Sequence, residues 1–183
     1  MNLLCGELVQ LAAVDSNVLA EAWARWSQDT EYSRFRFPMP AQPATASSIR
    51  NGWGDVDDIP PDRFHFAFYT LAEHRLIGDG GLFDVDWVNG DAEVGLGIGE
   101  REYWSRGYGT DAIRLLLRYS FTELNLHRVT LTVLAANPRA RRSYEKVGFV
   151  LEGLQRKQSQ YAGQRVDEVY MGILRSEWER AGG

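Results

Sequence analysis

The pattern of hydrophobic and polar positions changes its period several times along the chain, and each change marks a predicted element. Residues 16 to 28 carry apolar side chains at helical spacing, and Asp15 or Ser16 is available as the N-cap of this helix. Shorter runs with strand character follow at residues 64 to 70, 75 to 83 and 92 to 98. The last two runs are joined through Asn89-Gly90, a strong hairpin signal, so we expect three antiparallel strands.

The second half of the chain alternates between helical and strand patterns. The expected elements are a helix at about 109 to 124, a strand at 128 to 134, a helix at about 138 to 147 and strands at 149 to 158 and 165 to 174. The strand at 92 to 98, the helix after it and the next strand form a β-α-β unit, whose strands run parallel with a right-handed crossover. We therefore predict an α/β (α+β) fold with a mixed, largely antiparallel central sheet that is flanked by helices.

The stretch from Pro38 to Pro61 shows neither the helical nor the strand period. Five of the six prolines fall between Pro38 and Pro61, together with two glycines. The same stretch carries an acidic group, Asp55, Asp57, Asp58 and Asp62. It is therefore expected to be largely irregular, and loops of this kind often determine specificity.

Length and composition narrow the class of protein. A chain of 183 residues suits a single domain, placed here at residues 1 to 183, and its net charge of −5 argues against a nucleic-acid partner. Cys5 cannot make an internal disulfide, and neither a run of about 18 or more apolar residues nor a signal-peptide pattern occurs. We expect a cytoplasmic protein with no membrane partner.

Two common kinds of catalytic site find no support in the sequence. His65, His74 and His127 do not have the spacing of metal ligands, and no Ser-His-Asp or Cys-His arrangement is convincing. We therefore expect neither a metal nor a covalent nucleophile.

The stretch "EYWSRGYGTDAIRLLL" suggests a phosphate site. Gly107 and Gly109 come immediately before an amphipathic helix, where the backbone can approach a ligand closely and unpaired N–H groups attract an anion. This turn follows the carboxyl end of the strand at 92 to 98, which is where α/β sheets bind ligands.

That strand has one almost bare face. Alternation places Ala92, Val94, Leu96 and Ile98 on one side and Glu93, Gly95, Gly97 and Gly99 on the other. Glycines weaken a strand unless a ligand or another backbone must come close, or a bulge is needed. We favour the approach of a ligand, because three successive glycines on one face are hard to explain as packing.

The stretch "AANPRARRSYEKVGF" contains the signals of a helix. Asn137 can cap it, Pro138 suits its first position and Gly148 ends it. Tyr144 faces inward toward the sheet, which is the usual place of a core residue. The basic residues Arg139, Arg141, Arg142 and Lys146 surround the rest of the helix. Such a cluster is usually a solvated face, although here it lies next to the proposed phosphate turn.

Together these segments resemble the GNAT superfamily of acyl-CoA-dependent N-acyltransferases over residues 92 to 172. The turn is similar to the family's pyrophosphate loop, Gln/Arg-x-x-Gly-x-Gly/Ala, with Gly107 and Gly109 on the small positions. Trp104 takes the place of Gln/Arg, a departure familiar in the branch of the ribosomal-protein N-terminal and spermidine acetyltransferases. The stretch "FTELNLHRVTLTVLAANPRARRSYEKVGFVLEG" resembles the same branch almost throughout.

The resemblance implies an acetyl-CoA site in a cleft where the two parallel strands splay apart. The residues expected to hold acetyl-CoA are Ile98, Arg106, Gly107, Tyr108, Gly109, Thr110, Asn137, Arg139 and Arg142. Asn137 either caps its helix, contacts the pantetheine arm, or does both through different atoms. Tyr144 matches the tyrosine with which the family protonates the leaving thiolate, or it is simply a core residue.

The resemblance also implies transfer of an acetyl group to a primary amine by direct attack. Glu93 is the candidate base, directly or through water, unless it only bonds to a neighbouring backbone group. We expect a protein or peptide N-terminus as the acceptor. The alternatives are a polyamine, another small amine of the aminoglycoside kind, or a non-catalytic acyl-CoA-binding module; we also allow for a homodimer.

The entry for the acceptor is expected at residues 29 to 62 and at the hairpin loop near Tyr161. Phe35, Phe37 and Trp53 could hold an apolar side chain beside the amine. Equally, these aromatic residues could merely cover the sheet.

Overall fold

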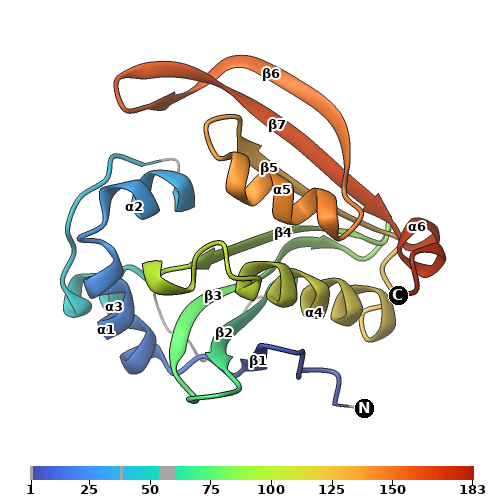
Figure 1. Ribbon diagram of the computed structural model, residues 1–183, viewed down its shortest axis with the longest axis horizontal. Coiled ribbons are helices and arrows are strands. Elements are labelled where there is room, and N and C mark those ends of the chain that lie inside the picture. The colour runs from blue at the N-terminus through green and yellow to red at the C-terminus, as the bar shows by residue number, and fades with distance from the viewer. Residues whose placement is uncertain (1, 38, 54–60) are drawn as a thin grey trace.

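A seven-stranded sheet forms the centre of the computed structural model, which describes residues 2–37, 39–53 and 61–183 (Figure 1). The strands are β1 (Val9–Ala12), β2 (Phe64–Thr70), β3 (Leu76–Asp86), β4 (Asp91–Ile98), β5 (Arg128–Leu134), β6 (Val150–Tyr161) and β7 (Gln164–Leu174). Their order in the sheet is β1-β2-β3-β4-β5-β7-β6, and all neighbours are antiparallel except β4 and β5. The predicted mixed sheet with one parallel pair is confirmed.

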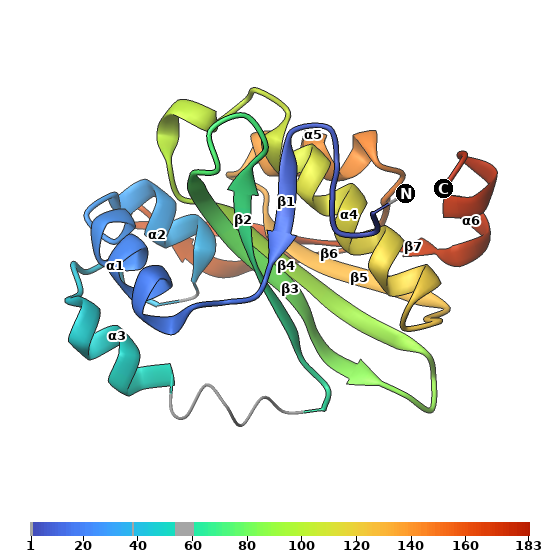
Figure 2. The same ribbon diagram turned by 90° about the horizontal axis from the view of Figure 1, so that it is seen from below.

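The helices form two groups, which both ribbon views separate (Figures 1 and 2). The first group is α1 (Ser16–Trp26), α2 (Thr30–Arg36) and α3 (Ala46–Trp53). The second contains α4 (Tyr108–Thr122) and α5 (Pro138–Lys146), and the short α6 (Arg175–Arg180) follows the last strand. No helix within the described residues is long and apolar enough to cross a membrane.

The best-defined part of the core lies under α4. Ile113, Leu116, Leu117 and Phe121 are fully buried there against the sheet, as the helical spacing predicts. A second, smaller core of Leu19, Ala22, Trp26 and Tyr32 joins α1 to α2. Asp15 and Asp29 cap these two helices by accepting hydrogen bonds from first-turn N–H groups.

The N-terminal segment is attached to α4 by two of its polar side chains. The buried Asp111 carboxylate accepts hydrogen bonds from the N–H groups of residues 7 to 9, at 2.8 to 3.2 Å. Arg118 donates to the carbonyl groups of Asn2, Leu3 and Cys5. These contacts position β1 at the edge of the sheet, a strand that the hydrophobic pattern did not predict.

The N-terminal third differs most from the sequence-based expectation. α2 and α3 were not predicted, and α3 lies inside the stretch that was expected to be largely irregular. The prolines described by the structure flank α3 rather than enter it, and Thr45 caps its start by accepting from the N–H of Ser48 at 3.2 Å. The predicted acidic residues 55, 57 and 58 lie outside the described residues.

The parallel pair opens along its length. β4 and β5 are paired only where residues 91 to 93 lie beside residues 128 to 130. Beyond that point β4 continues to Ile98 and β5 to Leu134 without further pairing to each other. The predicted splay is therefore present, and it leaves backbone groups of both strands free to bind a ligand.

Candidate active site

A cavity of about 1090 Å³ opens where β4 and β5 separate. Its walls come from α2, β4, β5, the first turn of α4, the inner side of α5 and the β6–β7 hairpin. It brings together most of the predicted site residues: Glu93, Ile98, Gly107, Gly109, Thr110, Asn137, Arg139 and Tyr144. Segments distant in the sequence thus contribute to one site.

Three predicted cofactor residues lie outside the cavity lining. Arg106 is exposed and donates to the Glu102 carbonyl at 3.1 Å. Tyr108 packs edge-on against Tyr103, with ring centroids 4.8 Å apart, and Arg142 is exposed on α5. Their part in cofactor binding stays a prediction.

The glycine turn has the backbone geometry of an anion site. Gly107 is the N-cap of α4 in the left-handed conformation, with φ of +92°, and Ser105 is also left-handed at +59°. No side chain caps the helix, so the first-turn N–H groups remain available. Asp111 does not oppose an anion there, because its carboxylate is engaged by residues 7 to 9. The turn therefore fits a pyrophosphate group.

Trp104 connects this turn to the cavity wall. Its indole Nε1 donates to the Ile98 carbonyl at 2.6 Å, which fixes the ring against the end of β4. The Arg139 guanidinium lies 3.8 Å from the ring centroid, close enough for a cation–π contact. Burial lowers the pKa of Arg139. The tryptophan at the Gln/Arg position thus places an arginine from α5 beside the turn.

Asn137 acts as a helix cap and also lines the cavity. Its Oδ1 accepts a hydrogen bond from the Ala140 N–H at 3.1 Å, and Pro138 occupies the first turn. Gly148, with φ of +101°, follows the end of α5. The predicted cap is confirmed. Because it uses only the oxygen, the two amide donors of Asn137 are left for a ligand.

Tyr144 lies between the core and the cavity. Its ring packs edge-on against Phe149, with centroids 5.9 Å apart, so the inward orientation is confirmed. Burial raises the pKa of Tyr144 to about 12, and the positive charge of Arg36 offsets only part of that rise. The phenol therefore keeps its proton at neutral pH and can act as a general acid.

Glu93 stands at the last position where β4 pairs with β5. Its carboxylate accepts a hydrogen bond from the Thr132 hydroxyl at 3.5 Å. The alternative interpretation expected Glu93 to bond to a backbone group, whereas this contact is with a side chain. Burial raises the pKa of Glu93, and the negative charges of Asp84 and Glu168 raise it further. A carboxylate with a raised pKa is a stronger base, which suits proton removal from an amine.

The bare face of β4 is divided between the protein's own side chains and the cavity. Gly95 and Gly97 line the cavity, so the close approach of a ligand there stays a prediction. A side chain at Gly99 would collide with the Trp26 ring. An ideal Cβ on Gly97 would lie 2.9 Å from Arg36 Cδ and 3.0 Å from the Tyr32 hydroxyl. These glycines let α1 and α2 pack directly onto the strand.

The tip of the β6–β7 hairpin lies on the same side of the molecule as α2 (Figure 1). Phe35 on α2 stacks on Tyr161 at the hairpin tip, with ring centroids 4.9 Å apart and an interplanar angle of 10°. Phe35 and Phe37 line the cavity, whereas the Trp53 side chain lies outside what the structure describes.

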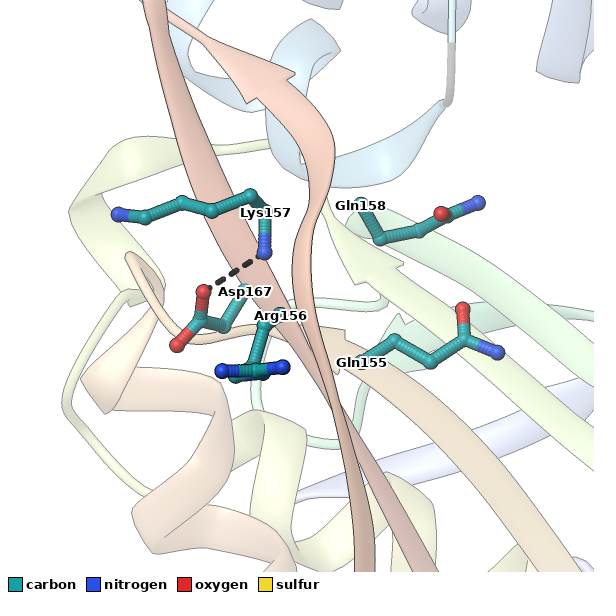
Figure 3. A pocket seen from close by; sticks show the side chains of 5 residues that line it. All are labelled: Gln155, Arg156, Lys157, Gln158 and Asp167. Carbon is teal, nitrogen blue, oxygen red and sulfur yellow. Dashed lines mark hydrogen bonds between the residues drawn. The ribbon is translucent and has the colours of Figure 1, made fainter.

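A second hollow of about 630 Å³ lies on the same hairpin, at the bulge of β6. Lys157 adopts a left-handed conformation there, with φ of +55°, and its N–H donates to Asp167 at 2.8 Å. The side chains around this hollow point to different sides of the hairpin and do not converge (Figure 3). It therefore lacks the arrangement of a catalytic site.

Comparison with known proteins agrees with this geometry. The family model described as an acetyltransferase (GNAT) domain matches residues 8–150. The chain is 35% identical over 127 residues to the putative ribosomal N-acetyltransferase YdaF of Bacillus subtilis, covering 66% of this chain and 69% of the relative. It is 36% identical over 107 residues to a spermidine N(1)-acetyltransferase of Vibrio cholerae, covering 58% and 61% of the two chains. The structure of a spermidine N-acetyltransferase from Vibrio cholerae in complex with CoA and spermine superposes with a TM-score of 0.80 at 25% identity, over 93% of this chain and 98% of that one.

Proposed function

The chain belongs to the GNAT acetyltransferase family, and from this premise we propose that it acetylates the primary amine at the N-terminus of a protein or peptide. The acceptor class is supported by the charge of the cavity. The charged residues among its described lining are Arg34, Arg36, Arg139 and Arg165 on the positive side and Glu93 and Glu168 on the negative side. Arg139 lies at the cofactor end and Arg36 is paired with the buried Asp79, so two arginines and two glutamates remain and carboxylates are not in excess.

The cofactor end of the cavity, made by residues 104–110 and 137–144, would hold acetyl-CoA. The N–H groups at the start of α4 and the Arg139 guanidinium match its diphosphate, and the free amide donors of Asn137 match its pantetheine arm. When bound, acetyl-CoA supplies an activated thioester, so an amine can attack it without a covalent enzyme intermediate.

Two side chains then move protons. Glu93 takes up the proton that the attacking amine loses, directly or through water. Tyr144 gives its phenolic proton to the sulfur as the carbon–sulfur bond breaks and the new carbon–nitrogen bond is complete. The raised pKa of Glu93 and the raised pKa of Tyr144 each favour the role assigned to that group.

The acceptor end of the cavity, formed by α2, β4 and the β6–β7 hairpin, suits a peptide better than a polyamine. A polyamine carries several positive charges and calls for a pocket rich in carboxylates. Here the described lining has no such excess of carboxylates, while Phe35 and Phe37 offer an apolar wall for a first side chain. Because one relative is named as a spermidine N(1)-acetyltransferase, a polyamine is the competing candidate for the acceptor.

A competition experiment tests the choice. Spermidine and short peptides that begin with Ala, Ser or Met are offered at equal concentration, and acetylated products are quantified by intact mass to give relative kcat/KM values. We expect the peptides to be preferred. A preference for spermidine of about tenfold or more, a difference of roughly 1.4 kcal/mol, would assign the polyamine instead. CoA binding without thiol release for any amine would indicate a non-catalytic module.

A further inference from the structure

The N-terminal loop, residues 2 to 9, encloses a carboxylate that belongs to the cofactor helix. The N–H groups of Glu7, Leu8 and Val9 donate to the Asp111 carboxylate of α4 at 3.2, 2.8 and 2.9 Å. Only 4% of the Asp111 surface is exposed. Successive backbone N–H groups that converge on one anion form a nest, and here the anion is a side chain of the protein itself.

The N-terminal loop is fastened to α4 at a second point. Arg118, two turns beyond Asp111, donates from Nη2 to the Cys5 carbonyl at 2.9 Å. The Gly6 N–H donates to the Val9 carbonyl at 2.9 Å and closes the loop. Figure 2 shows this N-terminal segment beside α4. The contacts around the nest therefore hold both the loop and the carboxylate in place.

Gly6 leaves the room that the Asp111 carboxylate occupies. An ideal Cβ on Gly6 would lie 2.7 Å from Asp111 Cγ and from Oδ1, and closer still to Oδ2. The φ angle of Gly6 lies outside the left-handed region, so the backbone accepts an alanine there. A side chain at residue 6 would thus push the carboxylate out of the nest rather than strain the backbone.

The N-terminal loop also lies against the glycine turn. An ideal Cβ on Gly107 would lie 3.2 Å from Leu8 Cδ1, so Leu8 supports this turn. Helical side chains tilt toward the N-terminus of their helix, which directs Asp111 toward the uncapped first turn of α4. A carboxylate released from the nest would be attracted by the first-turn N–H groups and would repel a diphosphate. Held in the nest, it leaves those N–H groups open.

We propose that the N-terminal loop is a positioning element of the cofactor site: it binds the Asp111 carboxylate and thereby keeps the first turn of α4 open for the CoA diphosphate. The inference rests on the proposed placement of the diphosphate at the glycine turn. Gly6 and Asp111 are positioning residues, because neither is among the residues that line the cavity. An acidic residue at the start of a helix stabilises the helix but competes with a bound anion unless it is held elsewhere.

The test displaces the carboxylate without a change in the cavity. Gly6→Ala adds the methyl group that collides with Asp111, and Gly52→Ala on α3, where an ideal Cβ meets nothing within 4 Å, is the matched control. CoA is titrated by calorimetry at low and at high ionic strength. We expect Gly6→Ala to weaken CoA binding by about fivefold to tenfold at low salt. The loss should be smaller at high salt, because salt screens the repulsion, and Gly52→Ala should bind CoA like the wild type.

Removal of the charge should restore binding. In Gly6→Ala/Asp111→Asn the displaced group is neutral, so we expect a CoA affinity within about twofold of that of Asp111→Asn alone. In Gly6→Ala the KM for acetyl-CoA should rise while kcat at saturation stays unchanged, a split that a general loss of stability does not produce. Unchanged CoA affinity in Gly6→Ala would overturn the proposal. A loss that persists in the double variant would overturn it too, because the loop and not the carboxylate would then be the cause.

Arg118→Met decides the question if Gly6→Ala does not fold. It releases Cys5 from α4 and keeps an aliphatic side chain, so we expect CoA binding about twofold to fivefold weaker, again restored by Asp111→Asn. Unchanged affinity would refute the proposal. CoA alone is titrated, so no result depends on the acceptor. If Gly109→Val weakens CoA binding and the loop variants do not, only this proposal fails; if none of them does, the placement of the diphosphate fails with it.

Discussion

The cofactor end of the cavity comes from two short segments, residues 104–110 and 137–144, whereas the acceptor end gathers side chains from α2, β4 and the β6–β7 hairpin. At the cofactor end the decisive features belong to the backbone, such as the left-handed Gly107 and the open first turn of α4. At the acceptor end they belong to side chains, including the Phe35–Tyr161 stack. If these assignments hold, we expect substitutions at the acceptor end to change acceptor choice and leave the cofactor end intact.

A chain of contacts nevertheless joins the two ends. Asp29, the cap of α2, forms a salt bridge with Arg101, whose guanidinium also lies 4.5 Å from the Trp104 ring centroid. Trp104 in turn contacts Arg139 at the cofactor end. The helix that carries the acceptor residues is thus tied to the segment that precedes the glycine turn.

The largest effect is expected at Tyr144, where a substitution can separate the chemical step from ligand binding. Tyr144→Phe keeps the packing against Phe149 and removes only the hydroxyl. We expect kcat to fall by about 10²-fold or more, while CoA binding persists. Single-turnover kinetics measures the chemical step. Exposed Arg114→Ala on α4 is the control, and an unchanged rate for Tyr144→Phe would return this residue to a packing role.

A smaller effect is expected at the glycine turn, where only the cofactor end should respond. An ideal Cβ on Gly109 meets nothing closer than Ile98 Cγ1, at 3.7 Å, so Gly109→Val adds bulk toward the cavity without backbone strain. We expect CoA affinity to fall by about tenfold or more with the fold retained, because the backbone can no longer approach the diphosphate. Calorimetry with CoA gives the result, and an unchanged Kd would remove the turn from the site.

Gly107 does not provide as clean a test. Its φ of +92° disfavours any side chain, and a Cβ would lie 3.2 Å from Leu8 Cδ1. Gly107→Val is therefore expected to lower both CoA affinity and the melting temperature. The difference between its melting temperature and that of Gly109→Val measures the effect of backbone strain.

The same contrast explains what the sequence could predict. The glycine turn, the Asn137 cap and the amphipathic α4 depend on residues close together in the chain, and each has a local signature. The splay of β4 and β5 followed from the family resemblance built on those signatures.

The acceptor end had no such signature. Tyr32 and Arg36 reach Gly97 only through the packing of α2 on β4. The Asp79 carboxylate binds three side chains that are far apart in the sequence, Trp23, Arg36 and His65, and only the fold brings them together. The bare glycine face indicated a close approach, but its pattern could not distinguish a ligand from the protein's own helices. Short helices such as α2 also carry too few turns for a clear period.

Glu93 should give a moderate, pH-dependent effect at the boundary of the two ends. It must be deprotonated to accept a proton, so activity falls as the pH drops through its pKa, which burial raises above the ordinary value of 4.5. We expect an acid limb in the kcat/KM profile with its midpoint above that value. Glu93→Gln should abolish the limb and lower activity at neutral pH by about threefold to tenfold, since water remains as a base. An unchanged limb would assign it to another group.

The smallest effect is expected at Asn137, where cap and ligand contact can be separated. Asn137→Ala removes both, and loss of an N-cap costs about 1 kcal/mol, which lowers the melting temperature by roughly 2–4 °C in a protein of this size. Asn137→Ser keeps a capping oxygen for the Ala140 N–H but lacks the amide donors that face the cavity. We therefore expect Asn137→Ser to melt like the wild type and to bind CoA about twofold to fivefold more weakly, as for the loss of a modest hydrogen bond. Equal CoA affinity for Asn137→Ser and wild type would limit Asn137 to the cap.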